Sequence, residues 1–179
     1  IGWVGTAKDH YKNLGLLAEV FKKLLTQTTV PFKFVLVGMW GYTKIKELFE
    51  PITGLNIEFI DYLPPTKMME TIQSFDIGVN PLLEKGEWNM SRSSYKPYEY
   101  MACGLAQITS AVGEITYVVH DDVDGYLADS VDEWVEKLKK LIESRELRAR
   151  LGRGGQENIR REEAYEVMMP RMVDIITKL

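Results

Sequence analysis

Short apolar runs alternate with segments of helical periodicity along most of the chain. Five of these runs have the length and composition of buried strands: residues 1–5, Phe32–Gly38, Ile57–Ile60, Asp76–Pro81 and Leu105–Ser110. A regular alternation of strand and helix predicts a parallel sheet with right-handed crossover connections. We therefore expect an α/β fold, a doubly wound, Rossmann-like parallel sheet flanked by helices.

The segments between these runs predict helices, and the final third of the chain is predicted to be helical. Apolar residues recur at helical spacing over Asn13–Thr26, Thr43–Glu50 and Lys67–Gln73, and Pro97 is expected at the first position of a further helix. In the final third we expect helices after the capping box at Ser130, from Ser144 through Leu151, and over Glu163–Lys178.

The composition is that of a globular protein and excludes several classes of function. The chain has 179 residues, 45% of them hydrophobic and 27% charged, unlike disordered segments. A net charge of −4 argues against a nucleic-acid partner. The single cysteine, Cys103, excludes a disulfide framework and a zinc site built from cysteines. No apolar run reaches the roughly 18 residues of a membrane span.

The chain starts inside a predicted strand, at Ile1, without an initiator methionine. We therefore expect residues 1–179 to form one domain of a longer protein. Without a predicted membrane span or signal peptide, the simplest expectation for localisation is cytoplasmic.

Ligands of doubly wound sheets bind outside the carboxyl ends of the strands, where loops lead into helix N-termini. In the first such loop, Gly5 closes a strand and Lys12 stands beside the start of a helix. A glycine, a helix N-terminus and a lysine can together bind an anion, although neither glycine-rich phosphate-binding motif is present. Lys12 is otherwise an ordinary surface lysine.

A second loop leads into the segment that carries Lys96, Pro97 and Glu99. A helix starting at Pro97 would bring its amides, its dipole and the Lys96 ammonium to one point, which suits a diphosphate. Glu99 could accept hydrogen bonds from hydroxyl groups such as those of a ribose. The alternative is that Glu99 favours the helix start and pairs with Lys96.

Three further features allow both a functional and a structural interpretation. Trp88 lies in Leu83–Ser94, the least regular stretch of the chain, and could stack on a sugar or anchor the loop. Asp122 and Asp124 have a spacing used for divalent metals on diphosphates, but also the composition of a turn before a strand. His10 is expected to face the ligand crevice as a polar contact. We assign no metal site and expect no cofactor.

The chain resembles the C-terminal, donor-binding domain of the retaining glycosyltransferases of group 1, which have the GT-B fold. The most specific likeness is Lys96–Gly113 (KPYEYMACGLAQITSAVG), and supporting ones are Val4–Leu14, Phe34–Gly38, Phe75–Leu82 (FDIGVNPL) and Val118–Ala128 (VVHDDVDGYLA). The resemblance covers nearly the whole chain and implies a nucleotide-sugar-binding domain that forms the C-terminal half of a two-domain enzyme.

The resemblance implies roles for particular residues. Glu99 matches the second glutamate of the family's E-x7-E signature, which holds the donor ribose, whereas Ser91 stands at the first glutamate. Thr6 stands where the family often has an arginine, and Lys12 keeps the family's lysine. Trp88 keeps the interval to Lys96 found in one subgroup.

The implied donor site therefore combines two sets of residues. The catalytic set is Lys12, Lys96 and Glu99, and the donor-binding set is Gly5, Thr6, Gly38, Tyr62, Trp88, Ser91 and Pro97. The nucleotide base would lie against the Ile60–Tyr62 edge.

The implied function is sugar transfer, of the hexosyltransferase type, from a nucleotide-diphosphate sugar with retention of anomeric configuration. A glycan, lipid or small-molecule acceptor would be bound by a preceding N-terminal domain, and peripheral membrane association of the full-length enzyme is compatible with this function. Two alternatives stay open. One is a sugar-nucleotide epimerase, which would need acidic residues around the anomeric carbon. The other is a non-catalytic binding or scaffold module, suggested by Thr6 and Ser91.

Overall fold

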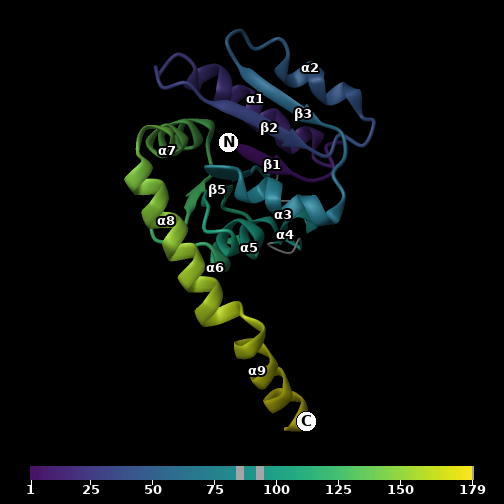
Figure 1. The fold of residues 1–179 in the computed structure, drawn as a ribbon, viewed down its shortest axis with the longest axis vertical. Helices are drawn as coiled ribbons and strands as arrows, with labels where there is room; N and C mark the ends of the chain where they lie inside the picture. Colours follow the sequence, from purple (N-terminus) through teal and green to yellow (C-terminus); the bar gives the residue numbers. More distant parts are fainter. Residues whose placement is uncertain (84–86, 92–94, 179) are drawn as a thin grey trace.

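A computed structural model describes residues 1–83, 87–91 and 95–178 of the chain (Figure 1). Its sheet consists of β1 (Gly2–Val4), β2 (Lys33–Val37), β3 (Asn56–Ile60), β4 (Ile77–Asn80), β5 (Ala106–Ser110) and β6 (Tyr126–Ala128). Every pair of neighbouring strands is parallel, in the order β3-β2-β1-β4-β5-β6. This is the strand order of a Rossmann fold, so the predicted α/β fold class is confirmed. β6 is not among the five predicted strands, although it follows the segment of Asp122 and Asp124 that has the composition of a turn before a strand.

The strands end level with one another at the carboxyl edge of the sheet. Val4 at the end of β1 is in register with Val37 of β2, which is in register with Ile60 of β3. Asn80 at the end of β4 is in register with Thr109 of β5. The loops that follow β1, β2, β3 and β4 therefore all leave from the same edge.

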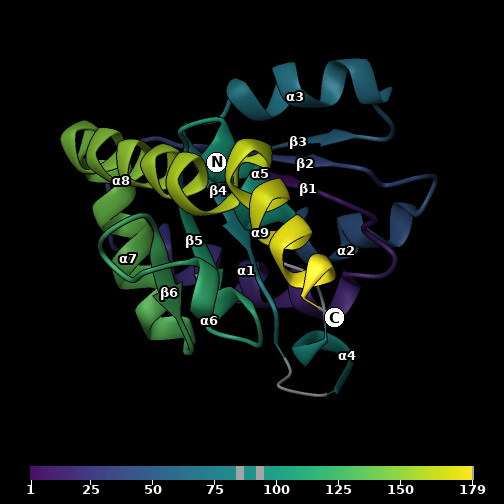
Figure 2. The same cartoon turned by 90° about the horizontal axis from the view of Figure 1, so that it is seen from below.

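The helices cover both faces of the sheet, as Figure 2 shows. The elements are α1 (Tyr11–Leu24), a 3-10 turn (Thr43–Ile45) leading into α2 (Lys46–Phe49), α3 (Pro65–Gln73), α4 (Glu87–Met90), α5 (Tyr95–Ala102), α6 (Ile115–Val118), α7 (Val131–Glu143), α8 (Arg145–Asn158), a π-helical turn (Ile159–Glu163) and α9 (Tyr165–Thr177). The side chains of α1, α2 and α7 share one hydrophobic cluster, while α3 and α5 pack in clusters with the other face.

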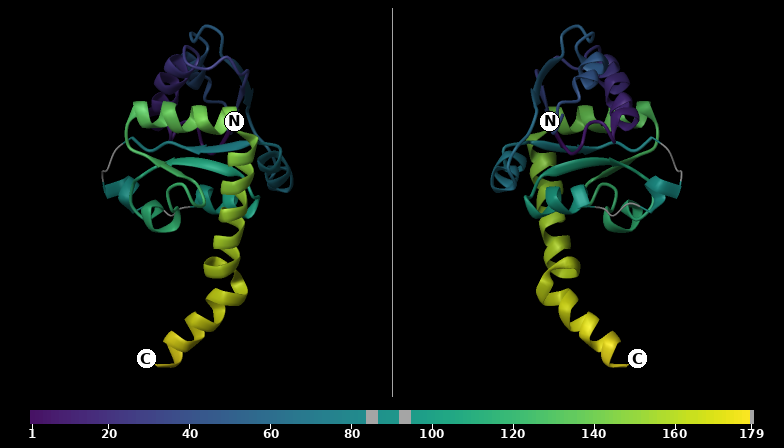
Figure 3. Two further views of the ribbon diagram at one scale, coloured as in Figure 1. Left: turned by 90° about the vertical axis from the view of Figure 1, so that its left-hand side faces the viewer. Right: turned by 90° about the vertical axis from the view of Figure 1, so that its right-hand side faces the viewer.

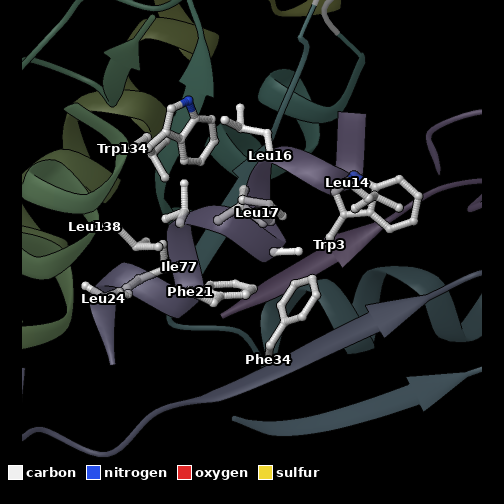
Figure 4. Close-up of a cluster of buried hydrophobic side chains, with 14 of the residues drawn as sticks. Trp3, Leu14, Leu16, Leu17, Phe21, Leu24, Phe34, Ile77, Trp134 and Leu138 are labelled. Carbon is white, nitrogen blue, oxygen red and sulfur yellow. The ribbon is translucent and has the colours of Figure 1, made fainter. Parts of the chain in front are cut away.

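The larger core lies between the sheet and α1, α2 and α7 (Figure 4). Trp3, Phe21, Phe34 and Trp134 are completely buried in it. The ring centroids of Phe21 and Phe34 are 4.9 Å apart in a tilted arrangement, which is favourable for aromatic pairs. This core holds β1 and α1 rigidly, and the loop between them is part of the candidate site.

The helix expected to end at Leu151 continues as α8 to Asn158 and then into the π-helical turn, so the predicted end is wrong. The glycines that suggest a helix stop are instead packing positions. A Cβ atom on Gly152 would lie 2.0 Å from the Gly104 carbonyl oxygen, and one on Gly155 would lie 3.0 Å from Cγ of Met101. The helix passes so close to the end of α5 that only glycine fits there.

The predicted helix caps of the final third are confirmed. The Ser130 hydroxyl accepts a hydrogen bond from the Glu133 amide at 3.2 Å, and the Ser144 hydroxyl accepts one from the Leu147 amide at 3.1 Å. These side chains satisfy amides that a helix start leaves without intrahelical partners. In the irregular stretch Leu83–Ser94, the part that the structure describes includes the short helix α4.

The last helix, α9, extends away from the rest of the chain, and the C-terminus lies far from the sheet (Figure 3). None of its residues is buried. Its exposed apolar side chains include Tyr165, Met172, Val173, Ile175 and Ile176. Within the described ranges, no helix has the length and apolar character needed to cross a membrane.

Candidate functional site

The candidate site lies where the strand order reverses, between β1 and β4. The loop after β1 leads to α1 on one face of the sheet, and the segment after β4 leads to α5 on the other. Connections that diverge in this way leave a crevice at the carboxyl ends of the strands. Residues of the first loop and of the Lys96 segment meet at this crevice.

Gly5 and Gly38 allow two loops of the site to approach backbone to backbone. Gly38 has a φ of +102°, and a Cβ atom there would lie 1.8 Å from the Gly5 carbonyl oxygen. The Gly5 amide donates to the Val37 carbonyl at 3.1 Å, and the Ala7 amide donates to the Gly38 carbonyl at 2.9 Å. These bonds shape the first loop as a close-packed turn at the crevice.

Lys96 lies directly against the first loop. Its Cε would be 3.2 Å from a Cβ atom on Gly5, and its Nζ is 5.6 Å from the centroid of the Trp3 ring. The structure therefore brings together Gly5 and Lys96, which are far apart in sequence. Their proximity places a lysine ammonium at the strand crossover point, where anions bind in such folds.

Two other predicted residues of the first loop are exposed. Lys12 is the second residue of α1. The carbonyl of Thr6 accepts hydrogen bonds from the Asp9 amide at 3.1 Å and the His10 amide at 3.2 Å, so this backbone turn leads directly into α1. Both side chains are on the surface at the carboxyl edge of β1.

His10 does not face the crevice, and that prediction is wrong. Only 2% of its surface is exposed, because its ring packs edge-on against Trp3, with the centroids 5.4 Å apart. The Asn13 side-chain amide lies 3.4 Å from Nδ1 of His10, and Oδ1 of Asn13 accepts from the Leu83 amide at 3.0 Å. Asn13 thus ties α1 to the segment after β4, a role the sequence analysis missed.

Pro97 is not the first residue of its helix, because α5 begins at Tyr95. Pro97 is buried and follows Tyr95 and Lys96, which already belong to the helix. Lys96 and Glu99 therefore both lie within α5.

Glu99 is half-buried on α5, in a groove of about 430 Å³. The groove is lined by Met69 of α3, by residues of α5, and by Ile159 and Glu163 of the π-helical turn. Burial raises the pKa of Glu99 above its ordinary value, and the positive charge of Lys96 opposes that rise. Lys96 and Glu99 thus interact electrostatically, as expected if they pair, and the ribose interpretation stays open.

An exposed aromatic pair stands where β2 and β3 end. Trp40 and Tyr62 are 61% and 49% exposed. The centroids of their rings are 4.7 Å apart in an edge-to-face arrangement. Trp40 has a φ of +52°, which is strained for a bulky residue. The Trp40 amide donates to the Asp61 carbonyl at 3.0 Å, and the Gly41 amide donates to Oδ1 of Asp61 at 2.7 Å.

These bonds hold Trp40 in the strained conformation with its ring in solvent. Tyr62 was predicted as a site residue, whereas Trp40 was not. The signal for Trp40 is a large aromatic residue between two glycines, Gly38 and Gly41, at the end of a strand.

Ser91 and Trp88 belong to the segment around α4. Ser91 follows α4 and is exposed, and its hydroxyl donates to the Glu87 carbonyl at 2.7 Å. The backbone of Trp88 is within α4, whereas its side chain lies outside the described part of the structure. A Cβ atom on Gly113 would lie 2.7 Å from the Met90 carbonyl oxygen, so α4 packs against the loop that follows β5.

The Asp122 and Asp124 carboxylates are bonded to different partners. Asp122 pairs with Arg150 at 2.6 Å on the surface. Asp124 is buried and accepts from the His120 amide and from His120 Nδ1, both at 2.7 Å, and from Asn158 at 2.8 Å. These contacts describe a turn tied to α8. Among the described residues, no group of three His, Cys, Asp or Glu side chains is placed to hold a metal ion.

Comparisons with known proteins agree with this architecture. A D-inositol 3-phosphate glycosyltransferase from Salinispora tropica is 38% identical over 64 residues, which are 35% of this chain and 13% of that protein. TarM from S. aureus, as a variant in complex with Fondaparinux, alpha-GlcNAc-glycerol and UDP, has a TM-score of 0.76 at 18% identity. That similarity covers 97% of this chain and 34% of TarM.

The C-terminal domain of a group 1 glycosyltransferase, LpcC from Francisella tularensis, has a TM-score of 0.69 at 18% identity, covering 92% of this chain and 84% of that domain. At these identities the two solved structures show a shared fold. The chain spans only a small part of the curated relative and about 34% of TarM. The sequence model of the family "Glycosyl transferases group 1" matches residues 1–144. This chain therefore belongs to the group 1 glycosyltransferases and has the fold of their C-terminal, donor-binding domain.

Proposed function

We propose that this chain binds the diphosphate of a nucleotide-sugar donor in the crevice between β1 and β4. The observation that carries the proposal is the contact region of Lys96 and Gly5, which sets an ammonium against a close-packed backbone turn. A lysine beside a turn and two helix starts offers both charge and hydrogen-bond donors to a diphosphate. Lys12, exposed near the start of α1, supplies a second positive charge.

We assign the remaining roles by the resemblance of these residues to the family's donor-binding positions. Glu99 accepts hydrogen bonds from the ribose hydroxyls, and the nucleobase lies against the exposed pair of Trp40 and Tyr62. Thr6 and Ser91 offer hydroxyls near the donor where the family has an arginine and a glutamate. Trp88 is proposed to contact the sugar. Pro97 shapes the first turn of α5 beside Lys96.

The reaction is proposed to be sugar transfer with retention of anomeric configuration. The bond between the anomeric carbon and the diphosphate breaks while the acceptor hydroxyl attacks from the same face. Negative charge then accumulates on the leaving diphosphate, and Lys12 and Lys96 stabilise it electrostatically. This mechanism needs no protein nucleophile. A glycan, lipid or small-molecule acceptor is bound by an N-terminal domain that precedes this one in the full-length enzyme, which we place in the cytoplasm.

The donor most worth testing first is one that carries uridine diphosphate, because the structurally similar TarM was crystallised with UDP. Calorimetry should measure UDP, GDP, ADP and inorganic pyrophosphate against the wild-type chain and Lys96→Ala. The substitution should weaken the binding of each of these ligands by roughly 1.5–3 kcal/mol, since it removes a charge-assisted contact.

Lys178→Ala is the matched control, since Lys178 is an exposed lysine at the C-terminal end of α9 that pairs with Asp174. It should leave all four affinities unchanged. A wild-type chain that binds none of the four ligands would favour the non-catalytic scaffold alternative. Binding that EDTA abolishes would contradict the proposal that lysines and helix dipoles neutralise the diphosphate without a metal.

Turnover assays distinguish transfer from epimerisation. The full-length protein should transfer the sugar of its donor to an acceptor, whereas this chain alone should bind the donor without transferring it, because the second wall of the catalytic cleft comes from the other domain. Sugar transfer by this chain alone would contradict that division of roles. Epimerised donor without acceptor consumption would favour the epimerase.

A further inference from the structure

We propose that Trp3 is a positioning residue for Lys96, holding the lysine side chain over the crevice in the orientation that meets an anionic ligand. The proposal rests on the proposed diphosphate-binding role of Lys96. Trp3 is in β1 on the face of the sheet covered by α1 and α7, whereas Lys96 comes from α5 on the opposite face. The two side chains meet at the carboxyl edge.

The contact is possible because Gly5 has no side chain. A Cβ atom on Gly5 would lie 2.8 Å from Cζ2 and 2.9 Å from Cη2 of Trp3, and 3.2 Å from Cε of Lys96. The six-membered ring of Trp3 and the end of the Lys96 side chain therefore converge on the space beside Gly5. The Nζ of Lys96 is 5.6 Å from the Trp3 ring centroid, within the range of a cation–π interaction.

The indole itself is held in place by buried neighbours. Trp3 is completely buried in the core (Figure 4), and the buried ring of His10 packs edge-on against it at a centroid distance of 5.4 Å. The His10 ring is in turn next to the Asn13 side chain, which is bonded to the Leu83 amide. The ring near Lys96 is thus fixed within a chain of buried contacts.

A rigid ring restricts where the flexible lysine can go. Lysine has four rotatable bonds and loses much conformational freedom when it is ordered by a ligand. An aromatic face under the ammonium and an apolar surface along its stem select one region before the ligand binds. Preorganisation of this kind strengthens binding without a new contact to the ligand.

The test is a double-mutant cycle on the affinity for inorganic pyrophosphate, measured by calorimetry on the 179-residue chain. The variants are Trp3→Leu, Lys96→Met and both together. Trp3→Leu should lower the affinity for pyrophosphate by about threefold or more. In the Lys96→Met background the same change should have almost no effect, because the side chain that Trp3 positions has no ammonium.

Trp134→Leu is the matched control. Trp134 is also completely buried in the same cluster, and among the described residues its indole Nε1, like that of Trp3, has no hydrogen-bond partner. It belongs to α7 and lies well away from Trp3 (Figure 4). Its substitution should lower the stability of the chain without changing the affinity for pyrophosphate.

Trp3→Phe covers the case in which Trp3→Leu does not fold. Phenylalanine keeps an aromatic face, so this variant should bind pyrophosphate within about twofold of the wild type, and its remaining effect should also disappear with Lys96→Met. Equal affinity losses in the presence and absence of the Lys96 ammonium would overturn the positioning role. So would equal losses for the Trp3 and Trp134 variants. A wild-type chain that binds neither pyrophosphate nor UDP would instead reject the proposed function itself.

Discussion

A Cβ atom on Gly38 would lie 1.8 Å from the carbonyl oxygen of Gly5, so these two glycines join the first two loops of the site without any side chain between them. Gly38 also has a φ of +102°, which side chains rarely adopt. Both properties make the pair a sensitive point of the site.

Gly38→Ala should lower the free energy of unfolding by at least about 3 kcal/mol, since it combines backbone strain with a backbone clash. Gly54→Ala separates the two effects, because Gly54 has a φ of +85° but no atom within 4 Å of the added Cβ. It should cost only about 1–2 kcal/mol. Urea denaturation measures both, and equal losses would mean that the contact with Gly5 contributes nothing.

Glu99→Gln should weaken the binding of UDP by about 1 kcal/mol or more. It should leave the affinity for inorganic pyrophosphate unchanged or slightly higher. Glutamine keeps the size but is a poorer acceptor for paired ribose hydroxyls, and a nearby negative charge is removed. Glu163→Gln is the control, because Glu163 lines the same groove; it should change neither affinity. Small and equal effects of Glu99→Gln on both ligands would favour the simple pair with Lys96.

The raised pKa of Glu99 predicts how stability depends on pH. Burial disfavours the ionised carboxylate in the folded state. A folded-state pKa above the unfolded-state value gives a stabilising contribution below the unfolded-state pKa, which is lost as pH rises through the folded-state pKa. The free energy of unfolding of the wild type, relative to that of Glu99→Gln, should therefore increase as pH falls from 7 to 4. Parallel denaturation curves across that range would contradict this.

Trp40→Gly should separate stability from binding. Glycine adopts a φ of +52° without strain, so the free energy of unfolding should rise by about 1 kcal/mol, since the exposed ring contributes little burial. The same change should weaken UDP by about 1 kcal/mol or more, through loss of base stacking, and leave pyrophosphate unaffected. A variant that binds UDP as the wild type does would show that the base lies elsewhere.

Asp124 and Asp122 should respond very differently to replacement by alanine. Asp124→Ala removes the buried acceptor of three hydrogen bonds, two from His120 and one from the buried Asn158 side chain, and should cost about 3 kcal/mol. Asp122→Ala removes an exposed pair with Arg150 and should cost less than about 1 kcal/mol. Thermal unfolding measures both. A loss of nucleotide affinity in either variant would instead point to a metal-binding role.

Local pattern was sufficient to predict most of the fold. Apolar runs such as Phe32–Gly38 and capping residues such as Ser130 and Ser144 act through their immediate neighbours, so their structure follows from short segments. The end of α8 was predicted wrongly because glycines such as Gly152 and Gly155 usually mark the end of a helix. Only the distant approach of Gly104 explains why it does not.

The site was less predictable because its geometry depends on tertiary contacts. The strand order that sets Lys96 beside Gly5 is a property of the whole sheet. The burial of His10 depends on Trp3 and on α1 together, and the positive φ of Trp40 depends on hydrogen bonds that Asp61, directly after β3, accepts. No spacing rule in the sequence reports such long-range effects.

The central position of β1 has a consequence for how the chain folds. Its pairing with β2 closes a short stretch of chain, but its pairing with β4 joins Gly2 to Gly78. Non-local parallel pairing is slow, because a long loop must be closed before the contacts can form. Gly5 and Lys96 come from the two parts of the chain that this pairing joins, so the crevice depends on it. Recovery of ligand affinity during refolding should therefore report the pairing of β1 with β4.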